Sequence, residues 1–355
     1  MRKAMAMLLA VGMAASMSAC SSSGSASGTT AAAETTAAVT ETTGAGAAAN
    51  SSTAVSSETD WPTGTITLLC GYSAGGSSDL NCRYMATALE KQLGQNVIVE
   101  NVPGSGSWLA WNRLLQNTEK DGNTFALINL SALYGHYDET NPREATIDDF
   151  ELLTNQVIDP QVICIRTDES RFTDYKSMVE YAKTNPLVVA AATSGITSGD
   201  ASVAKYLEKQ YGCQMNVIPV DGASDAETMF LAGETDILLG NVGDVMDAEA
   251  NGYKPIVIYA EERSEFLPDC PTEKETGAGG AYVSFSARGY AYPKGVDEAI
   301  VNKMIEAQKA AAEDPEYLDS MKALGCDVEV YAGEDYYNLL QDQLDQRLEI
   351  WGVQK

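Results

Sequence analysis

The sequence predicts a two-lobed α/β protein with a cleft between the lobes. Short apolar runs alternate with segments of helical periodicity, which is typical of an open sheet with parallel strands. The alternation occurs in two successive sets, separated near Pro160, and three more helices follow near the C-terminus. Because these helices would return to the first set, the chain would cross between the lobes twice, near residues 157–165 and 282–292. A ligand would then bind between the lobes, at the carboxyl ends of the strands.

The first set begins with an apolar run at 66–70, which we interpret as a buried strand. A helix should follow, because apolar side chains from Leu80 to Leu93 recur on one stripe and Gly94 is a suitable C-terminal stop. This set is completed by a strand at 97–99, a helix at 108–116 and a strand at 125–128.

The second set repeats the alternation. Ser224 and Glu227 have the spacing of a capping box, so a helix through Leu231 should begin there. Further strands are predicted at 162–165, 188–191, 217–220, 237–239 and 256–258, and an extended segment at 284–292. Helices are predicted at 176–184 and 198–211.

The first 19 residues resemble a bacterial lipoprotein signal peptide. Arg2 and Lys3 precede a short uncharged apolar run, and Met17-Ser18-Ala19-Cys20 resembles a lipobox. We therefore expect residues 1–19 to be removed and Cys20 to be lipidated, which would anchor the chain in the membrane at the outer face of the cell. An ordinary cleaved signal that contains a cysteine is the alternative.

The next segment, residues 20–60, is almost entirely Ser, Thr, Ala, Gly and Glu. It contains no aromatic residue and predicts a disordered linker. The folded part from Trp61 onward has about 295 residues, which suits two domains of ordinary size. We assign residues 61–160 with 286–355 to the first lobe and residues 161–285 to the second.

The formal net charge of −27 argues against nucleic acid or anionic lipid as a partner. Loss of Arg2 and Lys3 with the signal peptide would make the charge more negative by two. A small anion remains a possible ligand, because backbone N–H groups in a pocket can hold it while surface carboxylates are screened by salt.

Catalytic, metal and cofactor motifs are sparse. Beyond Cys20 there are six scattered cysteines with no CxxC pair, so we expect no metal site; the even count leaves disulfide pairing open. His136 is the sole histidine, and no Walker A motif is present. We expect no cofactor and no catalytic residues.

Three loops carry the candidate ligand-binding residues. The first joins a strand to a helix and supplies Tyr72, Ser73, Gly76, Ser77 and Ser78. Adjacent glycines allow close approach of backbone N–H groups, and the positive end of the helix dipole favours an oxyanion. A plain turn between strand and helix is the alternative.

The second lobe repeats this arrangement in a loop that supplies Thr193, Ser194, Thr197 and Ser198. Asp221 belongs to a third loop at a strand end. Several hydroxyl and amide donors could converge on one carboxylate there, although a solvated turn would show the same composition.

The sequence resembles the tripartite tricarboxylate transporter substrate-binding proteins, also called Bug receptors. The resemblance covers nearly all of the folded part and is most specific between Trp61 and Leu127. It is carried by Trp61-Pro62, Ile66-Thr67-Leu68, Ala74 to Asp79 with Arg83, Leu93-Gly94-Gln95, Val97 to Gly106 and Asp121 to Thr124, with looser matches at 192–195, 220–223, 231–236, 288–289 and 293–295.

The resemblance implies a type II fold of the periplasmic-binding-protein kind that closes on a small di- or tricarboxylate. It also implies delivery of this ligand to integral-membrane transporter subunits, one large and one small. The ligand carboxylates would be held at residues 73–78 and 193–198. We expect a monomeric receptor; a sensor lipoprotein, a carboxylate-based extracellular enzyme and an adhesin are the alternatives.

Three features depart from the family pattern. A proline-rich stretch with phenylalanine, frequent before the glycine pair, is replaced by Gly71-Tyr72-Ser73. A Tyr-Lys pair common in the family is replaced by Val220-Asp221, and a frequent histidine is replaced by Asp200. The loss of a lysine and the gain of two acids favour a ligand with one carboxylate and an amine or several hydroxyls at least as much as a multiply charged anion.

Overall fold

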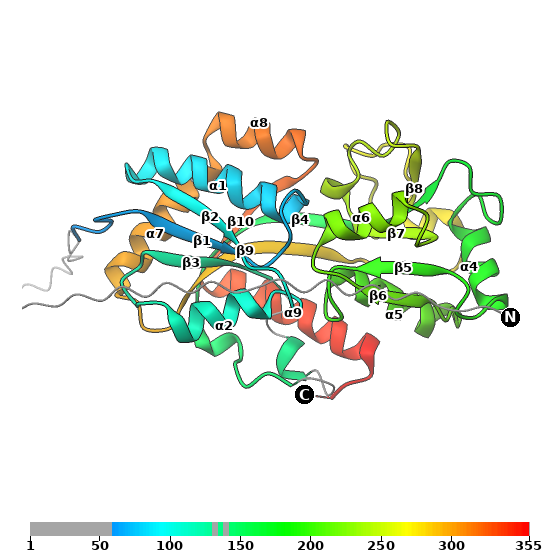
Figure 1. Cartoon of the computed structure of the whole chain (residues 1–355), viewed down its shortest axis with the longest axis horizontal. Coiled ribbons are helices and arrows are strands. Elements are labelled where there is room, and N and C mark those ends of the chain that lie inside the picture. The colour runs from blue at the N-terminus through cyan, green and yellow to red at the C-terminus, as the bar shows by residue number, and fades with distance from the viewer. Residues whose placement is uncertain (1–58, 130–133, 138–141, 355) are drawn as a thin grey trace, which may run out of the picture. The chain divides into compact units, whose positions relative to one another are not determined.

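The computed structural model describes residues 59–129, 134–137 and 142–354. The expected signal peptide, Cys20 and the linker up to residue 58 lie outside the described residues. In the described part, strands form one continuous network with the order β2-β1-β3-β9-β4-β7-β5-β6, and β10 and β8 pair with β4 (Figure 1).

The sheet of the first lobe is mixed. The strand β1 pairs in parallel with β2 and β3, whereas β9 is antiparallel to β3 and β4. Its strands are β1 (Ile66–Cys70), β2 (Val97–Asn101), β3 (Thr124–Ile128), β9 (Phe285–Pro293), β10 (Asp327–Ala332) and the first part of β4 (Phe150–Arg166). Helices cover both faces, so apolar runs such as Leu68-Leu69 are fully buried.

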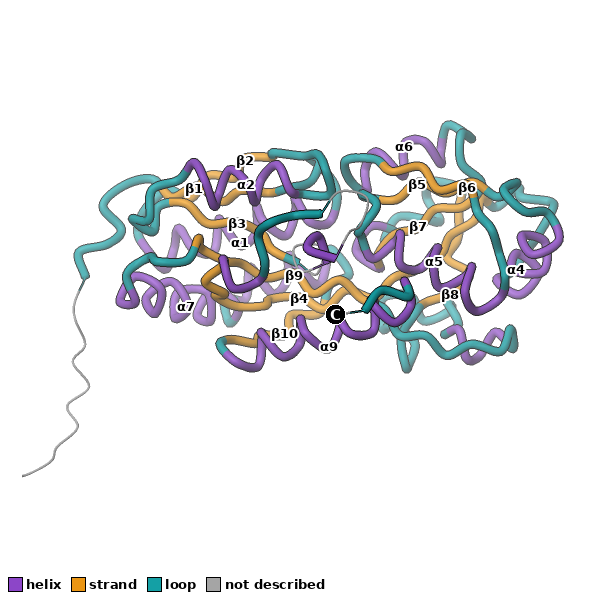
Figure 2. The backbone as a smooth tube through the Cα atoms, turned by 90° about the horizontal axis from the view of Figure 1, so that it is seen from below, coloured by secondary structure: helices purple, strands orange, loops and turns teal. Residues whose placement is uncertain are grey.

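Two helical layers enclose this sheet. The layer on one face is α1 (Ser77–Leu93), α7 (Glu298–Ala312) and α8 (Pro315–Ala323). The other face is covered by α2 (Trp108–Asn117) and α9 (Glu334–Trp351). Figure 2 shows α9 extending from beneath β10 and β4 toward the second lobe, where Trp351 Nε1 donates to Ser202 Oγ at 3.4 Å.

The second lobe has its own sheet and two layers of helices. Its strands are the last part of β4 together with β5 (Ala190–Thr193), β6 (Asn216–Pro219), β7 (Ile237–Asn241) and β8 (Tyr253–Ile258). The helices α4 (Tyr175–Thr184) and α5 (Gly199–Tyr211) cover one face, and α6 (Ala223–Leu231) covers the other.

The long strand β4 belongs to both sheets. It pairs with β9 from Phe150 to Pro160 and with β7 from Gln161 to Ile165. Beside it, Gln161 N donates to Ser284 O at 2.9 Å, so the two crossings of the chain lie next to each other. Both lobes are therefore joined through one narrow pair of extended segments.

The sequence prediction missed or misplaced several elements. It gave only 162–165 of β4, because buried polar residues such as Asn155 and Gln156 interrupt the apolar pattern. It omitted β10, whose residues are mostly half-buried or exposed, and placed the strand at 188–191 two residues early. These are boundary and pattern errors, and the alternation itself is correct.

The predicted capping box at the start of α6 is wrong. Gly222 occupies the N-cap position and makes no side-chain cap. Ser224 Oγ instead donates to Ala74 O at 3.3 Å, and Glu227 accepts from the Tyr253 hydroxyl at 2.7 Å. Both side chains that the local pattern assigned to the cap thus make tertiary contacts instead.

The six described cysteines are unpaired and buried, so the disulfide pairing that their even number left open does not occur among them. Burial well away from water makes them small apolar core residues. None of the helices in the described ranges is both long enough and apolar enough to span a bilayer.

Candidate functional site

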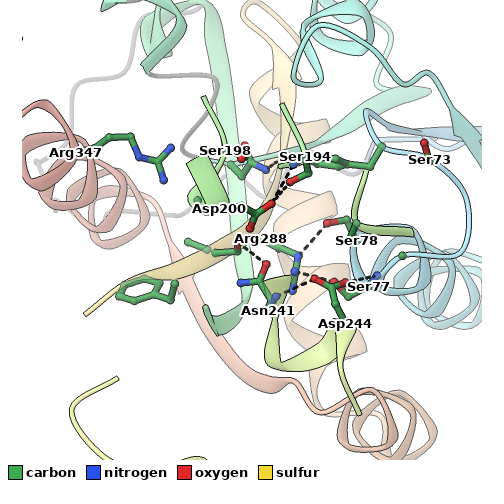
Figure 3. Close-up of a pocket in the computed structure, with 18 residues that line it drawn as sticks. Ser73, Ser77, Ser78, Ser194, Ser198, Asp200, Asn241, Asp244, Arg288 and Arg347 are labelled. Atoms are coloured by element: carbon green, nitrogen blue, oxygen red, sulfur yellow. Dashed lines mark hydrogen bonds between the residues drawn. The ribbon is translucent and has the colours of Figure 1, made fainter. Parts of the chain in front are cut away.

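A polar cavity of about 40 Å³ lies where the loops of the two lobes meet (Figure 3). Roughly 10–15 Å³ of such volume is needed for each water molecule, so the cavity has room for a few waters. Seven of the ten residues predicted to bind ligand line it: Tyr72, Ser73, Gly76, Ser77, Ser78, Ser194 and Ser198.

In the first lobe, Arg288 holds the two serines at the start of α1. Arg288 Nη2 donates to Ser77 Oγ at 2.9 Å, and Nε donates to Ser78 Oγ at 3.1 Å. Each serine therefore uses its oxygen to accept, and its own proton remains available for an acceptor in the cavity. The amide of Ser77 donates to Asp244 Oδ1 of the second lobe at 3.1 Å.

Arg288 is itself neutralised by a buried carboxylate. Its Nη1 lies 2.5 Å from Asp159 Oδ2, and both side chains are almost fully buried. Asp159 also accepts from the amide of Gly243 at 3.2 Å. Burial raises the pKa of Asp159 above its ordinary value, although the neighbouring guanidinium opposes that rise. This pair fixes the arginine beneath the cavity.

Asp79 is a structural residue of the first loop. Its carboxylate accepts from Gly75 N at 2.9 Å, Arg83 Nε at 2.9 Å and Asn101 Nδ2 at 2.8 Å. Burial alone would raise the pKa of Asp79, but these hydrogen bonds outweigh it and the pKa is lowered. The amide of Gly75 is thus already bound within the loop.

In the second lobe, the carboxylate of Asp200 accepts hydrogen bonds from both the amide and the hydroxyl of Ser194. Asp200 Oδ2 accepts from Ser194 N at 3.1 Å and from Ser194 Oγ at 2.6 Å. Burial raises the pKa of Asp200 to about 6, and the hydrogen bonds from Ser194 only partly oppose this. Ser198 is the N-cap of α5, since its Oγ accepts from Ala201 N at 3.2 Å.

The remaining three predicted residues lie outside the cavity. Thr193 ends β5 and is completely buried within the lobe. Thr197 lies in the turn before α5 and borders a neighbouring groove, together with the exposed Asp221. Asp221 contributes its backbone instead, because its carbonyl accepts from Ser73 N at 3.4 Å.

Arg347 of α9 is the residue that most changes the character of the site. Its side chain is 4 % exposed, and Nη1 donates to Thr197 O at 2.7 Å. No carboxylate in the described part of the chain forms an ion pair with it. Burial lowers its pKa, but an arginine remains protonated. Figure 3 shows the guanidinium directed toward the cavity.

The lobes touch at the edge of this cavity. Ser73 Oγ of the first lobe donates to Asp225 Oδ2 of α6 at 2.5 Å, and Ser224 Oγ donates to Ala74 O. A Cβ added to Gly222 would stand 3.0 Å from Ser73 N, so a larger residue there would push the two loops slightly apart.

The site can therefore bind an anion in a small polar chamber. It offers a buried unpaired guanidinium and serine hydroxyls, and a closed chamber strengthens such charge-assisted hydrogen bonds. Among the described residues, no group of histidine, cysteine and carboxylate side chains is arranged to hold a metal ion.

A two-lobed α/β fold with a polar chamber between the lobes defines a solute-binding protein of the periplasmic-binding class. Residues 82–352 match the family model described as the tripartite tricarboxylate transporter family receptor, and the chain belongs to this family. The resemblance and the fold class expected from the sequence are thus confirmed. This is a family of extracytoplasmic receptors.

Relatives agree with this assignment. The chain is 30% identical over 261 residues to the UPF0065 protein in the gbd 5' region of Cupriavidus necator, covering 74% of this chain and 78% of that one. It is 25% identical to protein BugT of Bordetella pertussis, with 72% and 78% covered.

Solved structures show the same fold. The periplasmic binding protein BugD superposes with a TM-score of 0.76 at 24% identity, covering 82% of this chain and 98% of that chain. MatC from Rhodopseudomonas palustris, solved with bound malate, gives 0.74 at 22% identity and 82% and 99% coverage.

Proposed function

We propose that the chain binds a small organic carboxylate outside the cell and delivers it to the membrane subunits of a tripartite tricarboxylate-type secondary transporter. The observation that carries this proposal is Arg347, a buried guanidinium that faces the cavity without a carboxylate partner in the described residues. An uncompensated buried charge is costly, and an anionic ligand would remove that cost.

The ligand would be gripped from both lobes. Ser77 and Ser78 offer hydroxyl protons from the first lobe, and Ser194 and Ser198 line the opposite wall. The cavity holds only a few waters, so a ligand of several heavy atoms enters when the lobes are apart and is enclosed when they approach. The paired segments of β4 and Ser284 are suited to act as the hinge.

This proposal includes the parts of the chain that precede the folded region. Cleavage of residues 1–19 and lipidation of Cys20 would place the receptor on the outer face of the cell membrane, with residues 20–60 as its linker. The hinge supports lobes made of 61–160 with 286–355 and of 161–285. MatC has bound malate and another R. palustris relative has adipate, both small dicarboxylates.

Mass spectrometry of small molecules released from the purified chain tests the binding role. We expect an organic carboxylate, and isothermal titration calorimetry with that compound should give a single site. Release of an altered compound after incubation would instead indicate an enzyme, and absence of any carboxylate ligand would contradict the proposal. Uptake of the labelled ligand by cells with and without the chain tests the transport role; equal uptake would refute it.

A further inference from the structure

We infer that the ligand is a zwitterion, with its carboxylate bound to Arg347 and a cationic amine bound to Asp200. This inference rests on the proposed receptor function and specifies its ligand class. It depends on how charge is distributed over the wall of the cavity, which the fold alone does not determine.

The cavity wall carries opposite charges at separate places. Arg288, Arg347, Asp200 and Asp244 all line it. Arg288 is already balanced by Asp159 beneath it, so its charge is not available to a second anionic group. What remains is one unpaired cation, Arg347, and two carboxylates. A ligand with one negative and one positive group is complementary to such a wall.

Asp200 has an acceptor atom to spare. Its Oδ2 accepts both hydrogen bonds from Ser194, and within the described residues no donor is recorded at Oδ1. Asp244 differs, because Ser77 N occupies its Oδ1 and Asn241 N occupies its Oδ2. Asp200 lies between Arg347 and Arg288 in the view of Figure 3.

A dicarboxylate meets less favourable surroundings. One of its carboxylates can bind Arg347, but the other must lie in the same small chamber as Asp200 and Asp244. Two like charges in a poorly hydrated site repel strongly, and the serine hydroxyls supply hydrogen bonds without opposing charge. An ammonium group at this end is attracted by both carboxylates.

Titration calorimetry with matched ligands tests the inference on the purified chain. Succinate is compared with 4-aminobutanoate, and glutarate with 5-aminopentanoate, since each pair exchanges one carboxylate for an ammonium group at similar length. The amine member should bind at least tenfold more tightly. The analogue 4-hydroxybutanoate, in which an uncharged hydroxyl replaces the ammonium group, should bind more weakly than 4-aminobutanoate, because a hydroxyl supplies the hydrogen bond without the charge.

The outcomes separate the two proposals. Tighter or equal binding of the dicarboxylates overturns the zwitterion inference and leaves the receptor function intact. If these ligands and a wider panel of carboxylates all fail to bind, the receptor function is refuted, and the zwitterion inference falls with it.

The variant Asp200→Asn gives a second, independent measurement. Asparagine can still accept from Ser194 through its own oxygen but lacks the charge. The ratio of amine to dicarboxylate affinity should fall at least tenfold, whereas Asp168→Asn, at an exposed position in the second lobe, should leave the ratio unchanged. Circular dichroism verifies that both variants fold, and an unchanged ratio in folded Asp200→Asn would overturn the inference.

Discussion

At the scale of single residues, Arg347 determines whether the cavity attracts an anion. We expect Arg347→Gln to weaken binding of the carboxylate ligand about 10- to 100-fold, the value of a charge-assisted hydrogen bond. The melting temperature without ligand should stay constant or rise, because the variant no longer buries an unpaired charge. Calorimetry and thermal unfolding measure both effects.

A matched control distinguishes this effect from a general loss of charge. Arg113 lies on α2, is paired with Glu100 and does not line the cavity. Arg113→Gln should leave ligand affinity unchanged. Normal binding by Arg347→Gln would contradict the assignment of that residue to the site.

Asp200 predicts a pH dependence of stability. Its pKa in the fold, about 6, lies above the ordinary value of 3.8, because burial disfavours the ionised form. The native state therefore binds the proton more readily than the unfolded chain. As a result, the free energy of unfolding of the protein falls as pH rises from about 4 to about 6. Asp200→Asn should be more stable than the parent at pH 7, by up to roughly 3 kcal/mol.

Denaturant unfolding of both proteins at pH 4, 5, 6 and 7 measures this difference. It should be small at pH 4 and reach its plateau above pH 6. Taking the difference between the two proteins cancels the contributions of carboxylates whose pKa is lowered by folding. Glu169 is one of them: its pKa is lowered to about 2, mainly by its hydrogen bond from Arg171. A constant difference across the range would show that burial of the charged form is not the cause.

The residues of the cavity were only partly predictable. Glycines and hydroxyls at strand ends indicate Ser77 and Ser194 from local sequence, because each of these serines is positioned by the loop in which it lies. Arg288 contacts Ser78 across 210 residues of sequence, and no local pattern reports such a contact. Arg347 had one detectable signal in the sequence, because it stands beside Leu340, Leu344 and Leu348, whose spacing marks the buried face of the last helix.

At the scale of elements, a buried carboxylate joins the outer helices of the second lobe. Glu273 is 1% exposed and accepts from the hydroxyls of Tyr175, Tyr206 and Tyr211 at 2.6, 2.9 and 2.8 Å. It also accepts from the amide of Tyr282 at 2.7 Å. One side chain thus connects α4, α5 and the segment that leads into β9.

Replacing this carboxylate should destabilise the lobe. We expect Glu273→Ala to lower the free energy of unfolding by about 3–5 kcal/mol, because one buried and three half-buried residues lose the acceptor of their hydrogen bonds. Urea unfolding measures the change. Glu261→Ala removes an exposed carboxylate of the same lobe and should alter stability by less than about 0.5 kcal/mol. Similar values for the two variants would argue that water replaces the lost acceptor.

The elements themselves were largely predictable, and the exceptions have a common cause. Helices such as α1 follow from apolar periodicity and a glycine stop, which are local properties. The strand β4 escaped because Thr154, Asn155 and Gln156 are polar and yet completely buried. Partners elsewhere allow this, for example Gln308, which accepts from Thr154 Oγ1 at 2.7 Å.

At the scale of the whole molecule, the contact between the two loops stabilises the closed arrangement of the lobes. Ser73 donates to Asp225 across the cleft, and this bond exists only when the loops are close. We expect Asp225→Ala to shift the unliganded protein toward more open forms. Ligand affinity should fall about 3- to 10-fold, because one net hydrogen bond of about 1 kcal/mol is lost from the closed state alone.

Distances between dyes on opposite lobes measure this shift directly. Labels would be attached to cysteines introduced at the exposed positions Gln92 and Asp168, since the six thiols of the described residues are buried. Asp225→Ala should broaden the distance distribution toward larger values, and saturating ligand should restore the parent distribution. Glu234→Ala, an exposed change just after α6, should do neither. If Asp225→Ala left both distance and affinity unchanged, the hydrogen bond from Ser73 would contribute nothing to closure, and the ligand contacts alone would have to hold the lobes together.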